Sequence, residues 1–571
     1  MTPRGVKTNI KPPEKVSGDH VRLAALGGLE EIGRNMSFIE YKNDIVAIDM
    51  GLQFPEETTP GVDFIIPNVS YLEERKEKVK AVIITHAHYD HIGAMPYLMG
   101  KLGNPPVYAT RMSRAIIEKR QNEFTNAPRL RVQEVRYGDR FKISENIELE
   151  FFGVDHTIPE TMGVIVKTPV GNIVHFADFR IEYNEKDEPQ GLETFKRIGD
   201  MGVHTFMVDS TNAEEEGHSL SEKVIEKNIE MLIKQAKGRI ILATFSSMIT
   251  RIAEIIKIAE KLGKKVAVNG RSMRDNVLIA KNLGYVKTKN KDTLIAVEDI
   301  HKYKDNEVLI LSTGAQGESS AGLMKIVTGI HKYIKLKVGD TVIFSSSVIP
   351  GNERGVQNLK DNLARQGAIV YTSSIIDIHV SGHAMKDDID LAVRALRPKF
   401  VMPVHGYYFM RFANGQNAVR AGVRPENVRL MDNGQVARLT KEEFVITGET
   451  VPANYVLVDG LGVGDIGEVV LRDRLLLAEE GMFVVITTLD RKTGRVIKNP
   501  DIISRGFIYL RENQELLDEI RRKVRGIFGR IPRREEVDTD YLKALIRDQI
   551  GQFLYNKTKR RPMVLPVIIE I

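Results

Sequence analysis

The chain has 571 residues, of which 42% are hydrophobic and 28% are charged. This composition is typical of a globular protein, and the length predicts three or four units of roughly 100–200 residues each. The chain contains no cysteine, which excludes disulfides and thiolate metal sites and leaves His, Asp and Glu to bind any transition metal. The net charge of +6 and the pI near 9.0 mildly favour a polyanionic partner.

The amino-terminal residues 1–18 are polar and contain prolines but no apolar signal segment. They are predicted to form a disordered leader. No apolar run approaches the ~20 residues that a membrane span needs.

Short strand patterns follow at 21–28, 36–41 and 44–51, separated by Gly and Asn turns. The glycine-rich segment 27–35 permits a nucleotide-binding loop, but it lacks the Lys-Ser/Thr ending and has the wrong glycine spacing. A tight turn between two strands is the favoured interpretation.

Residues 79–91, VKAVIITHAHYDH, form a buried strand pattern that leads into four metal-ligand side chains. His86 and His88 stand two residues apart, so in an extended segment they share a face and can bind one ion. Asp90 and His91 follow in the turn, where they can hold a second ion, before a helical pattern at 92–102. The segment therefore predicts part of a two-metal hydrolytic centre.

Several later strand patterns also end in polar residues of types that bind metals. Because the carboxyl ends of strands gather sites in layered α/β sheets, these residues can converge in space. They are Asp155, His156, Asp178, Asp209 and His405. A lone histidine at such a place is more often structural, but four ligand types in six residues favour metal binding. Two ions roughly 3.5–4 Å apart would activate water and neutralise an ester or phosphodiester, and His and Asp ligands suit Zn²⁺ or Mn²⁺.

Between residues 213 and 375 helical patterns at 220–237 and 248–263 alternate with apolar strand patterns. This alternation predicts βαβ units with a parallel sheet, inserted into the first domain because His405 lies beyond it. A glycine-rich joint near residue 460 begins a small α+β unit, with strand patterns at 483–489, 507–510 and 563–571.

The motif His86-x-His88-x-Asp90-His91 with downstream His156 and Asp178 resembles the metallo-β-lactamase fold signature. The inserted domain, followed by SGHA (381–384) and PVHG (403–406), resembles the β-CASP subgroup of nucleic-acid hydrolases. From about residue 20 to 571 the chain is similar to the bacterial ribonuclease J family. The segments that carry this similarity are ALGGLEEIGRN, FADFR, VDSTN, TGAQGE, SSSVIPGNE, DIHVSGHA, MDNGQV, DIISRGF and KTKRRPMVLP.

The resemblance implies an α/β fold: a metallo-β-lactamase αββα sandwich with an inserted β-CASP α/β domain and a small α+β C-terminal domain. The boundaries expected for these parts are 19–212 and 376–445 for the two parts of the metallo-β-lactamase domain, 213–375 for the β-CASP domain, 446–459 for a linker and 460–571 for the C-terminal domain.

The same resemblance implies roles for individual residues. His86, His88 and His156 would hold one ion, Asp90, His91 and His405 the other, and Asp178 would bridge them. Two ions per subunit are expected, Zn²⁺ first, with Mn²⁺ and Mg²⁺ as alternatives. Asp209 and His383 match the acid/base pair of the family, as proton donor and proton acceptor respectively.

The substrate pocket implied by the resemblance joins Phe245, Ser246 and Ser247 to a second segment of the chain, which consists of His379, Val380, Ser381, Gly382 and His383. Serine hydroxyls and backbone N–H groups at a helix start are a ready site for a 5′-monophosphate. The family also has a structural calcium site, which here would involve Pro60, Val62 and Asp459.

The implied activity is a metal-dependent ribonuclease, both 5′→3′ exonuclease on 5′-monophosphorylated RNA and endonuclease, serving mRNA turnover and rRNA processing. The resemblance implies a cytoplasmic homodimer or homotetramer that binds RNA, meets other RNA-decay proteins and does not contact a membrane. The alternatives are a small-molecule metallo-hydrolase of the same fold, a non-catalytic RNA-binding subunit, and DNA as the substrate.

Three departures from the family pattern stand near the expected site. Tyr89 replaces a common acidic residue, Tyr407-Tyr408-Phe409 replaces Glu-Tyr-Arg, and Ala315 replaces Ser. No metal ligand is lost, so the predicted effect is on the surroundings of the ions and on RNA contacts.

Overall fold

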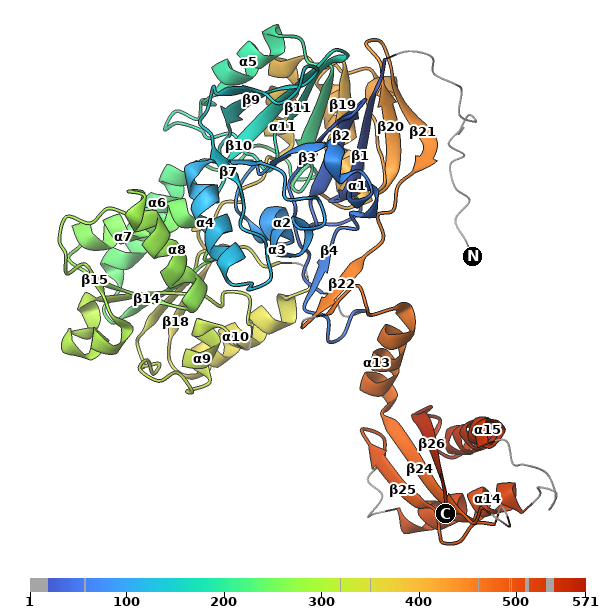
Figure 1. Cartoon of the computed structure of the whole chain (residues 1–571). Coiled ribbons are helices and arrows are strands. Elements are labelled where there is room, and N and C mark those ends of the chain that lie inside the picture. Colours follow the sequence, from blue (N-terminus) through green and yellow to red (C-terminus); the bar gives the residue numbers. More distant parts are fainter. Residues whose placement is uncertain are drawn as a thin grey trace. The chain divides into compact units, whose positions relative to one another are not determined.

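The computed structural model describes residues 19–55, 58–318, 320–349, 351–460, 462–491, 493, 495–508, 513–529 and 539–571. It separates into two compact units (Figure 1). The first contains the chain up to Gln53 and Ile66–Tyr455, and the second contains Phe54–Ile65 and Val456–Ile571. The predicted leader at 1–18 lies outside the described residues. Among the helices of the described residues, none is long and apolar enough to cross a membrane.

The first unit begins with an eight-stranded sheet in the order β21-β20-β1-β2-β3-β5-β6-β7. Its amino-terminal strands are rich in apolar and β-branched residues, as the sequence predicts. The bounds are β1 Val21–Gly27, β2 Met36–Tyr41, β3 Asp44–Ile48, β5 Val79–Ile83, β6 Val107–Ala109, β7 Val132–Glu134, β20 Gln435–Leu439 and β21 Phe444–Thr450. Residues 28–35 connect β1 to β2 as an eight-residue loop instead of the predicted tight turn, with Gly28 and Gly33 at positive φ.

A six-stranded sheet in the order β19-β12-β11-β10-β9-β8 faces the first one. Its strands β11, β12 and β19 are parallel, so their carboxyl ends meet at one edge. The bounds are β8 Arg140–Lys142, β9 Glu148–Gly153, β10 Met162–Thr168, β11 Gly171–His175, β12 Thr205–Asp209 and β19 Phe400–Val404.

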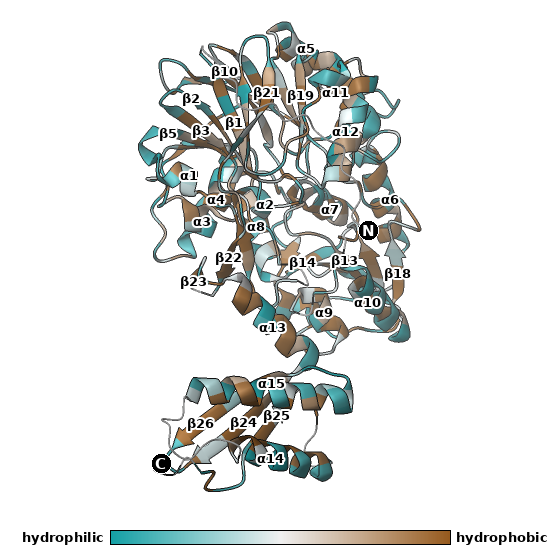
Figure 2. Cartoon of the chain, turned by 90° about the vertical axis from the view of Figure 1, so that its right-hand side faces the viewer, coloured by the Kyte–Doolittle hydropathy of each residue, from teal (hydrophilic) through white to brown (hydrophobic). Residues whose placement is uncertain are grey.

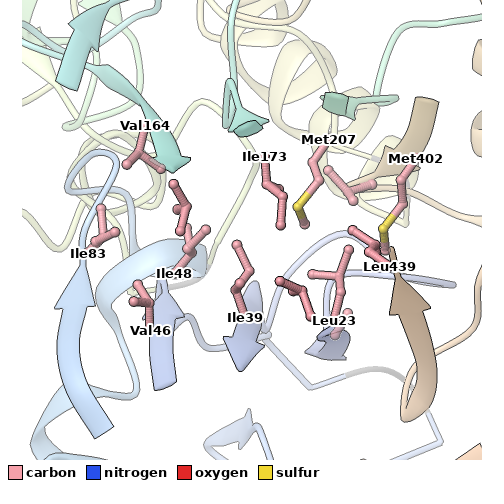
Figure 3. Packing of buried hydrophobic residues seen from close by; sticks show 14 of the residues in the cluster. Leu23, Ile39, Val46, Ile48, Ile83, Val164, Ile173, Met207, Met402 and Leu439 are labelled. Carbon is pink, nitrogen blue, oxygen red and sulfur yellow. The ribbon is translucent and has the colours of Figure 1, made fainter. Parts of the chain in front are cut away.

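Apolar side chains of the two sheets meet in a common core (Figure 3). Ile39 and Ile48 of the first sheet point toward Ile173 and Met207 of the second, and all four are essentially buried. The other face of the second sheet is packed against α5 (Leu192–Asp200), α11 (Lys386–Leu396) and α12 (Tyr408–Arg420). The remaining helices of this part are α1 Ser70–Glu73, η1 Lys76–Lys78, α2 Tyr89–Ile92, α3 Met95–Leu98, α4 Arg111–Asn122 and η4 Pro425–Asn427. The layered sandwich predicted from the sequence is therefore present.

The inserted domain is built on an all-parallel sheet in the order β15-β14-β16-β13-β17-β18 (yellow-green in Figure 1). It enters the chain between β12 and β19, which are themselves neighbours in the second sheet. Its strands are β13 Ile240–Ala243, β14 Lys265–Asn269, β15 Leu294–Ile295, β16 Val308–Ser312, β17 Thr341–Phe344 and β18 Ile369–Thr372. Its helices are α6 Glu222–Gln235, α7 Ile249–Lys261, α8 Arg271–Asn282, η2 Val297–Lys302, η3 Asp305–Glu307, α9 Gly322–Val327 and α10 Glu353–Arg365.

The second unit is the predicted α+β arrangement. Its sheet, β25-β24-β26, is largely brown in Figure 2, and it shares a core with two amphipathic helices. The elements are β4 Phe64–Ile66, β22 Val456–Asp459, β23 Gly462–Val463, α13 Glu468–Glu480, β24 Met482–Leu489, β25 Asp501–Arg505, α14 Gln514–Phe528, α15 Thr539–Thr558 and β26 Met563–Glu570. Residues 509 and 510 of the strand predicted at 507–510 lie outside the described residues, and Phe507 packs into the core. The strand Asp501–Arg505 was not predicted.

Candidate metal centre

The ends of strands from both sheets meet at one place in the first unit. His86 follows β5, Asp178 follows β11, and His405 follows β19. Sharp backbone turns direct these side chains inward, because Ala177 and His405 both adopt left-handed φ values, 61° and 52°. Such conformations are unfavourable for residues with a Cβ and are retained where the surrounding structure fixes them.

Three imidazoles form the first ligand group. The Nε2 atom of His86 lies 3.0 Å from Nδ1 of His88, and Nε2 of His156 lies 3.2 Å from the same atom. Asp178 Oδ2 lies 3.6 Å from Nε2 of His86 and 3.8 Å from Nε2 of His156. Together these four side chains can surround one ion.

The second group consists of Asp90, His91 and His405, again with Asp178. His91 Nε2 lies 3.3 Å from Asp178 Oδ2, and His405 Nε2 lies 3.3 Å from Asp90 Oδ2. Asp178 therefore belongs to both groups, as a bridging carboxylate must. The two predicted ligand sets are brought together in full.

Burial and charge distinguish the two groups. Burial lowers the pKa of His86 and His156 well below the usual histidine value and that of His88 to about 4, so these rings are neutral and can each offer a lone pair. Burial opposes protonation of His405 as well, but Asp178, Asp209 and Asp90 raise its pKa to about 10. The carboxylates thus place a strong negative potential on the second group.

The donor set fits two divalent cations. Asp178 is 1% exposed, and its Oδ1 atom is buried without a hydrogen-bond partner among the described residues. A buried carboxylate oxygen left unpaired is costly, and a bound cation removes that cost. Within each group the ligand atoms lie within 4.8 Å of one another. Imidazole and carboxylate together suit Zn²⁺ and Mn²⁺.

A layer of outer hydrogen bonds orients the ligands, and sequence reasoning missed most of it. Asp49 Oδ2 lies 2.8 Å from Nδ1 of His91, while its Oδ1 accepts from the backbone N–H of Thr85 at 2.8 Å. The carbonyl oxygen of Gly382 lies 2.7 Å from Nδ1 of His156. Asp49 directly follows β3, so the same strand-end signal that marked Asp178 could have identified it.

Asp209 and His383, the expected acid/base pair, are in direct contact. His383 Nδ1 lies 2.8 Å from Asp209 Oδ2. Burial disfavours charge on both, yet their mutual attraction raises the pKa of His383 and lowers that of Asp209. Asp209 also accepts a hydrogen bond from Thr211 Oγ1 at 2.7 Å. The side chain of His383 is 21% exposed, so this pair can reach a substrate.

The two predicted substrate segments each follow a strand of the inserted sheet. Phe245–Ser247 connects β13 to α7 and is partly exposed. His379–His383 follows β18, and His379 contacts the side chain of Arg251, which stands four residues after Ser247 in α7. At its other end, Gly382 and His383 contact the metal centre. The second segment therefore extends from Arg251 to the metal centre.

The departures from the family pattern have distinct surroundings. Tyr89 is 38% exposed, and the Arg120 guanidinium lies 5.2 Å from its ring centroid. The ring of Tyr407 is parallel to that of Phe409, with centroids 6.1 Å apart. Ala315 is 3% exposed and packs in the core of the inserted domain, so a polar contact from this position would need a rearranged loop.

The residues predicted to bind calcium do not fit that ion as they are arranged. The guanidinium of Arg474 donates to the carbonyl oxygen of Pro60 at 3.3 Å and to Asp459 Oδ2 at 2.6 Å. Val62 is 5% exposed and has an apolar side chain. The guanidinium of Arg474 thus already satisfies the ligand oxygens of Pro60 and Asp459.

Comparison with known families agrees with this geometry. The β-lactamase superfamily domain matches residues 58–226, the ribonuclease J β-CASP domain matches 237–363, and the ribonuclease J C-terminal domain matches 469–571. A solved structure of a protein of unknown function from Enterococcus faecalis V583 superposes with a TM-score of 0.52 at 16% identity. It covers 74% of this chain and 100% of its own, and it speaks for the fold alone.

Full-length relatives are more informative. Ribonuclease J2 of Bacillus subtilis is 36% identical over 559 residues, which cover 98% of this chain and 100% of the relative. Ribonuclease J 1 of Streptococcus pyogenes is 37% identical over 561 residues, which cover 98% of both chains. The chain belongs to the ribonuclease J family.

Proposed function

We propose that this protein degrades 5′-monophosphorylated RNA in the 5′→3′ direction and also cuts RNA internally, in RNA maturation and decay. Family membership makes the chain a metal-dependent ribonuclease. Direction and end preference rest on one observation: the His379–His383 segment contacts Arg251 at one end and His156 and Asp209 at the other. A 5′-phosphate held on this segment would place the first linkage over the metal ligands, which favours removal of a terminal nucleotide.

Two metal ions, when bound, would activate water and neutralise the phosphodiester under attack. His86, His88 and His156 would hold one, Asp90, His91 and His405 the other, and Asp178 both. We infer zinc as the natural metal, supported by the three neutral imidazoles of the first group. Asp209 would orient the His383 ring and share a proton with it, so that the pair serves the leaving oxygen.

The location, oligomeric state and partners of the protein are inferred from the family. A cytoplasmic homodimer or homotetramer, working with other RNA-decay proteins, is the expected form. The complete set of seven ligand residues speaks against a non-catalytic subunit, and the ribonuclease J domain matches speak against a small-molecule hydrolase.

The test uses one RNA sequence with a 5′-monophosphate, 5′-triphosphate or 5′-hydroxyl end, and DNA of the same sequence. Each is incubated with Zn²⁺, Mn²⁺ or Mg²⁺. We expect release of mononucleotides from the monophosphate RNA well ahead of the others. Equal cleavage of all ends, with only internal products, would refute the exonuclease proposal.

A further inference from the structure

A buried arginine contacts the start of the His379–His383 segment of the predicted nucleotide pocket. Arg251 lies in the first turn of α7, just after the Phe245–Ser247 loop, and is 3% exposed. Its Nε and Nη2 atoms donate to the two carboxylate oxygens of Glu222, at 3.0 and 2.7 Å. Its Nη1 atom donates to Ser345 Oγ at 3.1 Å. Every nitrogen of this guanidinium therefore has a partner.

The same Nη1 atom reaches the His379 segment. It lies 3.5 Å from the carbonyl oxygen of Ile378 and 3.5 Å from Nδ1 of His379. Ser345 Oγ also donates to the Ile378 carbonyl, at 2.7 Å. Burial and the charge of Arg251 lower the pKa of His379 to about 3, so the ring is neutral and its nitrogen can accept. Arg251 thus fixes where the segment begins.

Glu222 extends the connection to the metal domain. Besides Arg251, its Oε1 atom faces Nη2 of Arg180 at 3.2 Å. Arg180 stands two residues after the bridging ligand Asp178, and its backbone N–H donates to the carbonyl of Asp155, the neighbour of His156. The carboxylate of Glu222 is therefore held between one arginine of the inserted domain and one of the metal domain.

We propose that Arg251 is a positioning residue that sets the distance between the 5′-phosphate pocket and the metal centre. This inference rests on the proposed function, since it names what fixes that same pocket. Lysine cannot replace it, because a single ammonium cannot pair with Glu222 in bidentate fashion and also reach Ser345 and Ile378.

The inserted domain offers a matched control. Arg239 precedes β13, at the opposite end of the strand from Phe245, and is paired with Asp340 through two hydrogen bonds of 3.0 and 2.6 Å. Arg239 is 4% exposed and Asp340 1% exposed. Replacing Arg239 therefore breaks a buried pair of the same kind without touching the pocket.

The experiment compares R251K, S345A and R239K with the wild type. Values of kcat and KM are measured on RNA with a 5′-monophosphate and with a 5′-hydroxyl, together with bound metal and the unfolding temperature. We expect R251K to lose ~10–100-fold in kcat/KM on the monophosphate RNA, as for a misplaced substrate, with little change on the hydroxyl RNA. S345A removes the hydrogen bonds of Ser345 to Arg251 and Ile378 but leaves the pair of Arg251 with Glu222, and it should show a smaller loss of the preference for the monophosphate.

R239K is expected to lower the unfolding temperature and keep the preference for the monophosphate. If R251K and S345A keep it too, or if R239K loses it equally, the positioning role is refuted. If the wild type itself shows no preference, the proposed function fails and this inference with it. A protein that prefers the monophosphate in the wild type and in R239K, but not in R251K, supports both.

Discussion

The metal centre and the Pro60–Asp459 loop both gather ligand-type atoms, but they differ in what remains unsatisfied. At the metal centre, Asp178 Oδ1 is buried without a hydrogen-bond partner among the described residues, and imidazole nitrogens face one another. In the loop, Arg474 donates to the oxygen atoms that would bind an ion. The comparison shows that unmet hydrogen-bonding capacity, more than ligand identity, marks a cation site.

The difference has a structural origin. The metal ligands follow strands whose carboxyl ends converge from two sheets, where the backbone supplies no donors to pair with them. The loop oxygens lie within reach of a cation on α13, at the end of a long flexible side chain. Removing a ligand at the metal centre should therefore weaken metal binding, whereas removing Arg474 from the loop should not.

The largest effect is expected from removing a ligand. Replacing His88 or Asp90 by alanine should abolish RNA cleavage, a loss of ~10³-fold or more, because the ions supply several kcal/mol of transition-state stabilisation. Activity and metal content are measured after metal stripping and repurification. His204→Gln is the control. This buried histidine lies at the amino end of β12, away from the metal ligands, and contacts the carbonyl oxygen of Thr440. Retained cleavage in H88A would contradict the two-metal assignment.

A smaller loss is expected from the outer hydrogen bonds. Asp49→Asn should weaken metal binding ~10–100-fold, because Asp49 orients His91. The measurement is metal affinity by competition with a chelator. Asp44→Asn is the control, because Asp44 begins the strand that Asp49 follows and contacts only Asn146 among the described side-chain partners. Equal metal affinities of the two variants would show that Asp49 does not orient His91 for metal binding.

The close approach of Gly382 to His156 provides a steric test. A Cβ at Gly382 would lie 2.5 Å from Cε1 of His156, so Gly382→Ala should displace this ligand and reduce cleavage by ~5–100-fold, the equivalent of ~1–3 kcal/mol of overpacking. Gly100→Ala is the control, because its Cβ would meet only Pro128 at 4.0 Å. Wild-type kinetics in G382A would mean that the segment has room to move.

The smallest effect concerns the loop. Calcium added to the zinc-loaded wild type should leave the unfolding temperature unchanged, because Arg474 satisfies the loop. Arg474→Ala should destabilise the C-terminal unit by no more than about 1 kcal/mol, since the pair with Asp459 is partly exposed. Arg472→Ala, on the same helix, is the control. A calcium-dependent rise in the unfolding temperature of the wild type would show that the ion displaces the Arg474 guanidinium from the loop oxygens.

Much of the fold could be predicted from the sequence because its elements carry strong local patterns. The buried run Val82–Ile84 indicated a central strand, and alternating helices and strands indicated the parallel sheet of the inserted domain. The seven metal ligands were found because they follow strands and resemble a family motif. The domain boundaries and the roles of these residues stay predictions.

Other features depend on contacts between distant segments and left no local signal. Arg251 and Arg474 look like ordinary helical arginines in the sequence, and only the fold shows that one is buried among pocket segments and the other reaches a loop. Asp49 had the strand-end signal but no motif. The strand at Asp501–Arg505 was not predicted, because its three polar residues leave only a weak apolar pattern.

The pairing of β12 with β19 has a consequence for how the enzyme comes into being. The ribosome makes His86 long before His405, and the whole inserted domain must be synthesised between the two neighbouring strands. A nascent chain that has not passed residue 405 lacks one ligand of the second group. The second ligand group therefore cannot be complete before the whole inserted domain has been synthesised.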